Sequence, residues 1–145
     1  PVQTAEVVEE VAAKADQLPE RPSVAPGTRL LVADDDELNR MIIDAAMTKL
    51  GYHVTTVADG RAAVEAARAE AFDAIILDIQ MPVMDGLKAH RAIRDEGLSR
   101  GKPVLAITAD VVPENVERYL AEGFDACLSK PYEWDAIDRA IRGTA

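Results

Sequence analysis

The sequence lacks several features on which whole classes of proteins depend. Its single cysteine, Cys127, cannot form an internal disulfide. Its apolar runs are far shorter than the roughly 20 residues that a transmembrane helix needs. Basic residues are few, with 16 Lys and Arg against 26 Asp and Glu and a formal net charge of -10. We therefore expect no membrane contact and no nucleic-acid partner, because a nucleic-acid surface requires clustered Lys and Arg.

The first apolar residues do not form a secretory signal peptide, because charged residues interrupt them from Glu6 to Lys14. We therefore expect an intracellular, cytoplasmic protein. The 145 residues, 48% of them hydrophobic, are enough for one domain with a short tail. Residues 1–18 have the apolar spacing of an amphipathic helix or tail, and residues 19–27 are rich in proline and read as a linker. The domain itself is expected to cover residues 28–143.

Within residues 28–143, short apolar segments alternate five times with amphipathic ones. The apolar segments, which we expect to be strands, are RLLVA, YHVTTV, FDAIIL, PVLAIT and DACLS. Each is followed by a segment with helical spacing; the first of these ends before Gly51 and places Leu38, Met41, Ile42 and Ala45 on one face. Strands that are apolar throughout are typical of a parallel sheet covered by helices on both faces. The expected class is therefore α/β, doubly wound.

Polar side chains stand where these expected strands end. Asp34, Asp35 and Asp36 follow the first strand, Asp78 the third, Thr108 the fourth and Lys130 the fifth, and in such a sheet ligands bind at this edge. Carboxylates that meet there repel one another, and Mg2+ with oxygen ligands relieves the repulsion. Lys130 as a charge and Thr108 as a hydrogen-bond donor would complete a phosphoryl site. Asp78 is then a candidate nucleophile, because carboxylates form aspartyl-phosphate intermediates.

Four motifs at these positions resemble the receiver domain of two-component response regulators: LVADDDELNR, AIILDIQMPVMDG, AITAD and LSKP. The resemblance covers about residues 28–142. It implies the flavodoxin-like fold with strand order 2-1-3-4-5. It also implies a phosphorelay function, in which Asp78 takes a phosphoryl group from a phosphohistidine of a histidine kinase or a histidine phosphotransfer protein and the domain then changes conformation. Such a domain catalyses only its own phosphorylation and dephosphorylation.

The resemblance also implies a metal site. Asp35 and Asp78 would bind Mg2+, or Mn2+, through their carboxylates, Asp34 would bind it through or near a water molecule, and Gln80 would contribute its backbone carbonyl. Gln80 and Asp110 would in addition influence how long the phosphoryl group survives hydrolysis.

The phosphoryl oxygens, by the same resemblance, would be contacted by Thr108 and Lys130, with the peptide between Lys130 and Pro131 in the cis form. Members of the family often carry an aromatic residue three positions before this lysine, and its ring moves together with the threonine. Here that position is Cys127, a small side chain that we expect to pack as a hydrophobe. The departure affects the relay of the signal, not phosphorylation itself.

Several alternatives stay open at this point. The tail, the linker and the LNRMI segment favour a receiver from a hybrid histidine kinase, whereas a stand-alone single-domain regulator is the main alternative. We expect no DNA-binding output domain after Gly143. A phosphatase of the haloacid-dehalogenase type could use Asp34 and Asp36, but the second acidic motif of that family is missing. A pseudo-receiver that binds partners without phosphorylation is disfavoured, because the acids, the threonine and the lysine are all present.

Overall fold

The computed structural model describes residues 19, 21–109, 112–131 and 133–144. The expected N-terminal helix and Asp110 lie outside the described residues. The described residues form one parallel sheet in the order β2-β1-β3-β4-β5, which confirms the predicted topology. Its strands are β1 (Thr28–Ala33), β2 (Tyr52–Val57), β3 (Ala74–Asp78), β4 (Val104–Thr108) and β5 (Ala126–Ser129).

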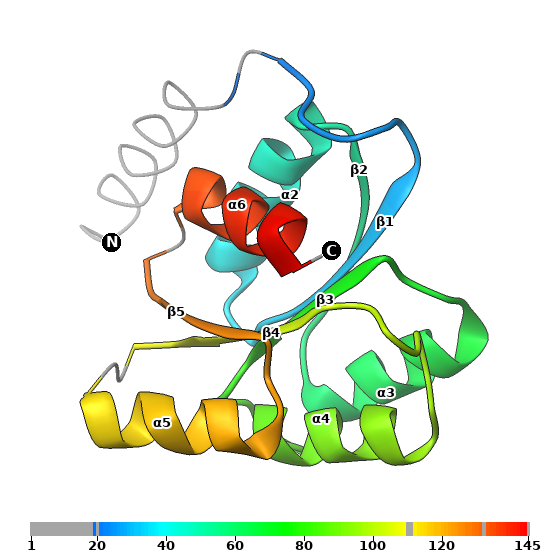
Figure 1. Cartoon of the computed structure of the whole chain (residues 1–145). Coiled ribbons are helices and arrows are strands. Elements are labelled where there is room, and N and C mark those ends of the chain that lie inside the picture. Colours follow the sequence, from blue (N-terminus) through cyan, green and yellow to red (C-terminus); the bar gives the residue numbers. More distant parts are fainter. Residues whose placement is uncertain (1–18, 20, 110–111, 132, 145) are drawn as a thin grey trace, which may run out of the picture.

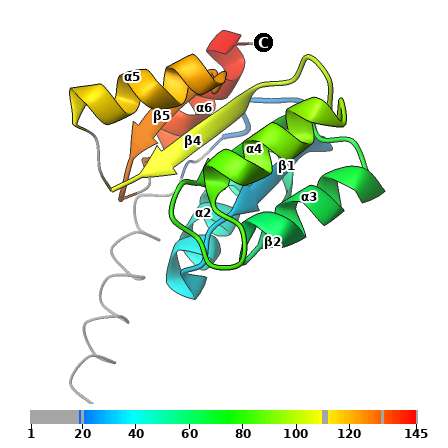
Figure 2. The same cartoon turned by 90° about the horizontal axis from the view of Figure 1, so that it is seen from below.

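Helices alternate with the strands and cover both faces of the sheet. They are α2 (Glu37–Lys49), α3 (Gly60–Ala69), α4 (Gly86–Asp95), α5 (Pro113–Glu122) and α6 (Trp134–Thr144). Helices α2 and α6 lie on one face, and α3, α4 and α5 lie on the other (Figures 1 and 2). None of the described helices is both long and apolar enough to cross a membrane.

The sheet separates two apolar cores, because successive side chains of a strand point to opposite faces. On β1, for example, Leu31 packs in the core between the sheet and helices α3 and α4, whereas Leu30 and Val32 pack in the core between the sheet and helices α2 and α6. Every residue of β3 and β4 is buried. This rigid centre fixes the positions of the residues at the strand ends, where the predicted site lies.

The predicted apolar face of the first helix is wrong. Met41 is 56% exposed, and α2 instead buries Ile43, Ala46 and Met47, followed by Leu50 just after its end. These four residues also have the spacing i, i+3, i+4, i+7 that marks one helix face. The segment from residue 41 to 47 has apolar residues on two different faces, so the spacing alone allowed two orientations of the helix. Contact with the sheet selects the second.

The segment before β1 is held against the domain. The backbone N–H groups of Ser23 and Val24 donate to the carbonyl oxygen of Leu50, at 2.8 and 3.3 Å. The Ser23 hydroxyl donates to Asp138 Oδ1 at 2.9 Å, and Asp138 is buried in α6 with 3% exposure. The domain boundary at residue 28 stays a prediction, but residues 23 and 24 already contact the folded domain.

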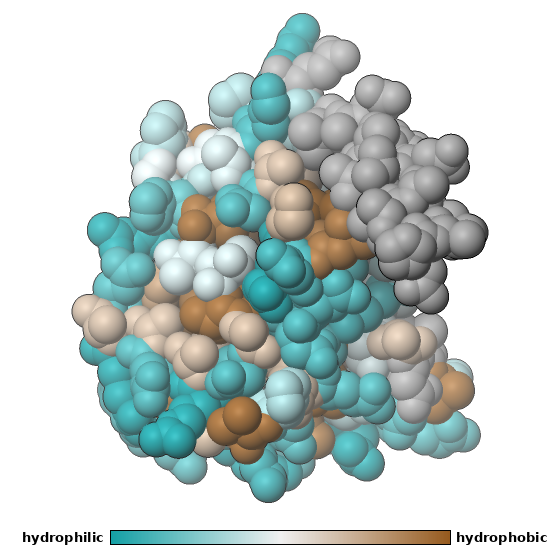
Figure 3. All heavy atoms as spheres, turned by 180° about the vertical axis from the view of Figure 1, so that it is seen from behind, coloured by the Kyte–Doolittle hydropathy of each residue, from teal (hydrophilic) through white to brown (hydrophobic). Residues whose placement is uncertain are grey.

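The surface seen from behind Figure 1 is mostly hydrophilic, with separate apolar patches between polar side chains (Figure 3). Among the described residues, the large apolar side chains with the greatest exposure are Met41, Val83, Val112 and Leu120. Two of them, Val112 and Leu120, come from the N-cap and the body of α5.

Candidate functional site

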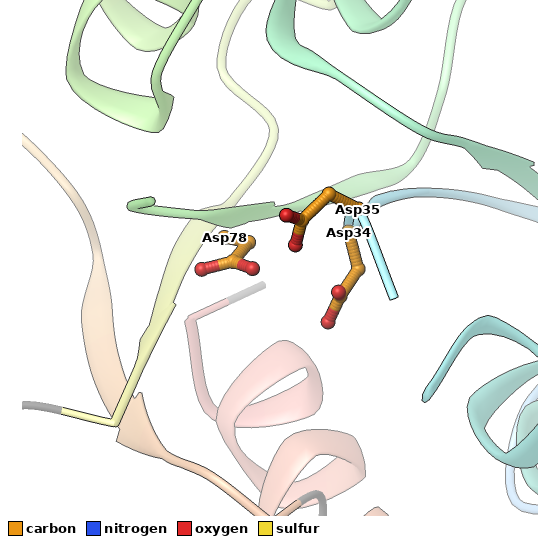
Figure 4. Close-up of side chains that lie close together, drawn as sticks. All are labelled: Asp34, Asp35 and Asp78. Atoms are coloured by element: carbon orange, nitrogen blue, oxygen red, sulfur yellow. The ribbon is translucent and has the colours of Figure 1, made fainter. Parts of the chain in front are cut away.

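Three of the predicted carboxylates meet at the carboxyl end of the sheet. Asp34 and Asp35 directly follow β1, and Asp78 is the last residue of β3, the strand that pairs with β1. One carboxylate oxygen from each of the three residues lies within 4.8 Å of the others. Figure 4 shows the Asp35 side chain extending towards Asp78. Asp34 and Asp78 are buried, whereas Asp35 is exposed, so one side of the cluster is open to solvent.

The third acid of the run has a structural role. Asp36 is the N-cap of α2, and its Oδ1 accepts hydrogen bonds from the backbone N–H groups of Leu38 and Asn39, at 2.9 and 3.3 Å. This satisfies donors that the first turn of a helix leaves without partners. Asp36 therefore serves the helix, and Asp34 and Asp35 are left for the site.

Lys130 reaches into the acidic cluster from the end of β5. Its Nζ donates to Asp78 Oδ2 at 2.7 Å and lies 3.6 Å from Asp34 Oδ2. The peptide between Lys130 and Pro131 is cis, as the resemblance implied. Burial alone would lower the pKa of Lys130, but the hydrogen bond to Asp78 and the surrounding carboxylate charges raise it overall. Lys130 therefore carries its positive charge throughout the physiological pH range.

The Asp78 carboxylate is subject to opposing electrostatic effects. Burial raises the pKa of Asp78, and the neighbouring Asp34 charge raises it further, against the lowering effect of Lys130 and of the Gln80 backbone N–H. The Gln80 N–H donates to Asp78 Oδ1 at 3.1 Å, so each oxygen of Asp78 accepts one hydrogen bond. These contacts fix the direction of the carboxylate.

Thr108 is held beside Lys130 by the sheet. It ends β4, is 2% exposed, and pairs in register with Ser129, the residue before Lys130. The backbone N–H of Lys130 donates to the Thr108 carbonyl oxygen at 3.0 Å. The sheet therefore brings Thr108 and Lys130 to neighbouring strand ends, as predicted from the sequence.

The loop after Asp78 passes so close to the strand end that it requires glycine. A Cβ atom on Gly86 would lie 2.4 Å from the Asp78 carbonyl oxygen, while the Gly86 N–H donates to the Ile79 carbonyl oxygen at 3.0 Å. An open groove of about 600 Å3 borders this loop. Its lining includes Asp35, Gln80 and, from α5, Arg118. A ligand can therefore approach the acidic cluster from this side.

Cys127 packs as a small hydrophobe. It is half-buried, packs against the core between the sheet and helices α3, α4 and α5, and pairs in register with Ala106 of β4. Burial raises the pKa of its thiol. The neutral thiol is therefore favoured at this position.

The residues of the cluster fit a divalent cation. Two of its three carboxylates, those of Asp34 and Asp78, are almost fully removed from water. The ammonium group of Lys130 pairs with both. Burying several like charges is expensive unless a cation compensates them. Hard oxygen ligands with one open side suit Mg2+, which retains several waters when it binds to proteins.

Two contacts to this cluster were missed at the sequence level. The Arg40 guanidinium donates to the Asp34 carbonyl oxygen at 2.7 Å, and Asn39 Nδ2 donates to Asp34 Oδ2 at 3.4 Å. Both residues lie in the LNRMI segment, whose resemblance to receivers of hybrid kinases is the sequence signal that could have indicated them.

Comparison with known proteins identifies many relatives. The RcsC sensor histidine kinase of Salmonella typhi is 37% identical over 112 residues, which are 77% of this chain and 12% of that protein. The GacS sensor protein of Pseudomonas syringae pv. syringae is 36% identical over 129 residues, 87% of this chain and 14% of the relative. The chain thus spans about an eighth of the length of the curated relatives that it matches.

Solved structures show the same fold. The receiver domain of sensor histidine kinase PA1611 from Pseudomonas aeruginosa PAO1, crystallised with magnesium coordinated in its active-site cleft, matches with a TM-score of 0.74 and 36% identity, over 81% of this chain and 96% of that one. The chemotaxis response regulator CheY4 of Vibrio cholerae matches with a TM-score of 0.76 and 30% identity, over 82% of this chain and 99% of the other.

The model of the response regulator receiver domain family matches residues 30–142, which include all the strand-end residues discussed above. The fold, the strand-end residues and the relatives agree with this match. The chain therefore belongs to the response regulator receiver domain family, and it is homologous to the receiver domains of sensor histidine kinases.

Proposed function

We propose that Asp78 accepts a phosphoryl group from a phosphohistidine, with Mg2+ held by the acidic cluster. The observation that carries this proposal is the 2.7 Å contact between Lys130 Nζ and Asp78 Oδ2 beside two further carboxylates. This arrangement provides a nucleophile, a cation for the phosphoryl oxygens and a place for a metal ion. Asp35 and Asp78 bind the cation through their carboxylates, Asp34 acts through water, and Gln80 contributes its carbonyl oxygen.

The transfer needs no other covalent group from the protein. A carboxylate oxygen of Asp78 forms a bond to phosphorus while the bond between phosphorus and the imidazole nitrogen breaks, and the electron pair returns to that nitrogen. Bound Mg2+ supplies charge neutralisation for the phosphoryl oxygens. Lys130 exchanges its contact with Asp78 for one with a phosphoryl oxygen, and Thr108 donates to another. The added charge of about -1.5 to -2 then drives the conformational change.

The donor is a histidine kinase or a histidine phosphotransfer protein, and the parent protein is a hybrid histidine kinase. Support for the second statement comes from the curated relatives, which are sensor kinases several times longer than this chain. A stand-alone regulator is the alternative, since CheY4 has the same fold and the match extends over 99% of the CheY4 chain. The cytoplasmic location expected from the sequence stays a prediction.

Phosphorylation can be tested with a small phosphodonor such as acetyl phosphate and Mg2+, followed by intact-mass measurement. We expect wild type to gain the mass of one phosphoryl group and Asp78→Asn to gain none. Omitting Mg2+ is expected to abolish the label as well. Asp73→Asn is a matched control. Asp73 is a partly exposed acid just before β3 and lies outside the acidic cluster, so its substitution should leave labelling intact.

The other outcomes distinguish the alternatives. Label that persists in Asp78→Asn but disappears in Asp34→Asn would indicate a phosphatase-like nucleophile at Asp34. Complete absence of label in wild type, with both Mg2+ and the donor present, would favour the pseudo-receiver and contradict the proposal.

A further inference from the structure

Three contacts from the N-cap and the first turn of α2 hold Asp34, two at its buried carboxylate and one at its carbonyl oxygen. Asp34 Oδ1 accepts a hydrogen bond from the Asp36 backbone N–H at 2.8 Å, and Asp34 Oδ2 accepts one from Asn39 Nδ2 at 3.4 Å. The backbone of Asp34 is held too, because Arg40 Nη1 donates to its carbonyl oxygen at 2.7 Å. The Asp34 side chain is 0% exposed. Its direction is therefore set by residues of the helix as well as by β1.

The Arg40 contact extends this control to Asp35. The carbonyl oxygen that Arg40 binds belongs to the peptide unit between Asp34 and Asp35. Peptide units are planar, so holding this oxygen fixes the plane from which the Cα atom of Asp35 continues. Asp35 is the exposed carboxylate of the cluster, and its backbone position decides where its side chain can reach. One guanidinium therefore influences two of the three carboxylates.

We propose that Arg40 and Asn39 are positioning residues for the divalent cation: they hold Asp34 and the peptide between Asp34 and Asp35 in the arrangement that Mg2+ requires. The inference rests on the Mg2+ site of the proposed function. Neither residue touches the cation. Groups that orient metal ligands typically change metal affinity about 10- to 100-fold when they are removed.

The direction in which Mg2+ affinity changes when Arg40 is removed tests this positioning role. Arg40 carries a positive charge and is hydrogen-bonded to the backbone of Asp34, a residue of the acidic cluster, so its charge repels Mg2+ bound there. If Arg40 acted only through its charge, removing it would strengthen Mg2+ binding. If Arg40 positions the ligands, removing it weakens binding in spite of the gain in attraction. The two roles therefore predict opposite changes.

The experiment is a calorimetric titration of the protein with Mg2+ alone, without a phosphodonor. We expect Arg40→Ala to weaken Mg2+ binding about 10-fold. Arg40→Lys should lose less, because an ammonium group can also donate to the Asp34 carbonyl oxygen. Asn39→Ala should lose less than Arg40→Ala, because its contact is the longer one. Arg61→Ala, which removes the same charge from an arginine whose side chain is 70% exposed in α3, should leave the affinity unchanged.

Folding is controlled by circular dichroism and thermal unfolding of each variant without Mg2+. If Arg40→Ala does not fold, the comparison of Arg40→Lys and Asn39→Ala with wild type decides the question. Unchanged or tighter Mg2+ binding in the folded Arg40 and Asn39 variants overturns the inference alone. Wild type that binds no Mg2+ overturns the proposed metal site, and the inference with it, so the two failures are distinguishable.

Discussion

At the residue scale, the chemistry of the site explains why the buried strand β3 ends in an acid, Asp78. Burial raises its pKa, which means that the folded protein disfavours the charged form that a nucleophile needs. Lys130 and a bound cation both favour the charged form again. The site therefore holds a carboxylate whose charge depends on its partners, as is common where an acid has a chemical role.

A second buried titratable residue, His90, gives a prediction of pH dependence. His90 is 1% exposed in α4, and its ring stacks on Phe124 with 4.2 Å between the ring centroids. Burial and the charge of Arg94 lower the pKa of His90, against the opposing effects of Glu122 and Asp125. The unfolded chain then binds a proton at a higher pH than the folded protein does.

The free energy of unfolding should therefore fall as the pH drops below the ordinary histidine value of about 6.5, with a slope of at most about 1.4 kcal/mol per pH unit from this residue. Urea unfolding between pH 7.5 and 5.5 measures it. The free energy of unfolding of wild type, minus that of His90→Phe, should fall as the pH falls, because only wild type carries the buried imidazole. Parallel curves for wild type and His90→Phe would contradict the assignment.

At the element scale, residues 23 and 24, before β1, are bound to the folded domain. They are held by the Leu50 carbonyl and by Asp138, whose Oδ1 also accepts from the Tyr52 hydroxyl at 2.9 Å and whose Oδ2 accepts from Arg142 Nε at 3.0 Å. Burial and the Asp138 carboxylate together raise the pKa of Tyr52. Strand β2, helix α6 and the entering chain are thus joined at one buried carboxylate.

Gly51 makes this close approach possible and provides the test. Its φ is +109°, and a Cβ there would lie 2.8 Å from the Val24 carbonyl oxygen. We expect Gly51→Ala to lower the free energy of unfolding by about 1–3 kcal/mol from backbone strain, with a further loss from the clash. It should also speed amide hydrogen exchange at Ser23 and Val24.

Gly101→Ala is the matched control, because Gly101 also has a positive φ of +78° but no atom within 4 Å of the added Cβ. It should carry the backbone strain without the clash and leave exchange at Ser23 and Val24 unchanged. Equal destabilisation by the two substitutions, with slow exchange retained at Ser23 in both, would show that the segment does not depend on Gly51.

At the scale of the whole molecule, the sequence predicted the topology and the site for one reason. Parallel strands joined by helices bring all their carboxyl ends to one edge, so residues far apart in the chain, such as Asp34, Asp78 and Lys130, could be placed together without coordinates. Thr108 was located in the same way. This reasoning needs the strand ends, which the apolar segments marked, and the strand order, which the resemblance to receiver domains implied.

Features that depend on side-chain reach or helix rotation could not be predicted in this way. The orientation of α2 was wrong because Met41 and Ile43 are both apolar but lie on different faces of the helix, and the spacing alone did not select between them. Arg40 contacts the Asp34 carbonyl oxygen, and Ser23 contacts Asp138. No helical or strand periodicity in the sequence indicates either contact. Such contacts follow from packing, which adjusts each side chain to the assembled fold.

The central claim is that Asp78 takes a phosphoryl group from a phosphohistidine, and transfer from a purified, histidine-phosphorylated phosphotransfer domain tests it most directly. With Mg2+ present, we expect label to leave the donor and appear on wild type as an acid-stable, alkali-labile acyl phosphate, and not to appear on Asp78→Asn. Transfer of equal extent to Asp78→Asn, or none to wild type from any of a panel of such donors while the small phosphodonor labels Asp78, would contradict the account.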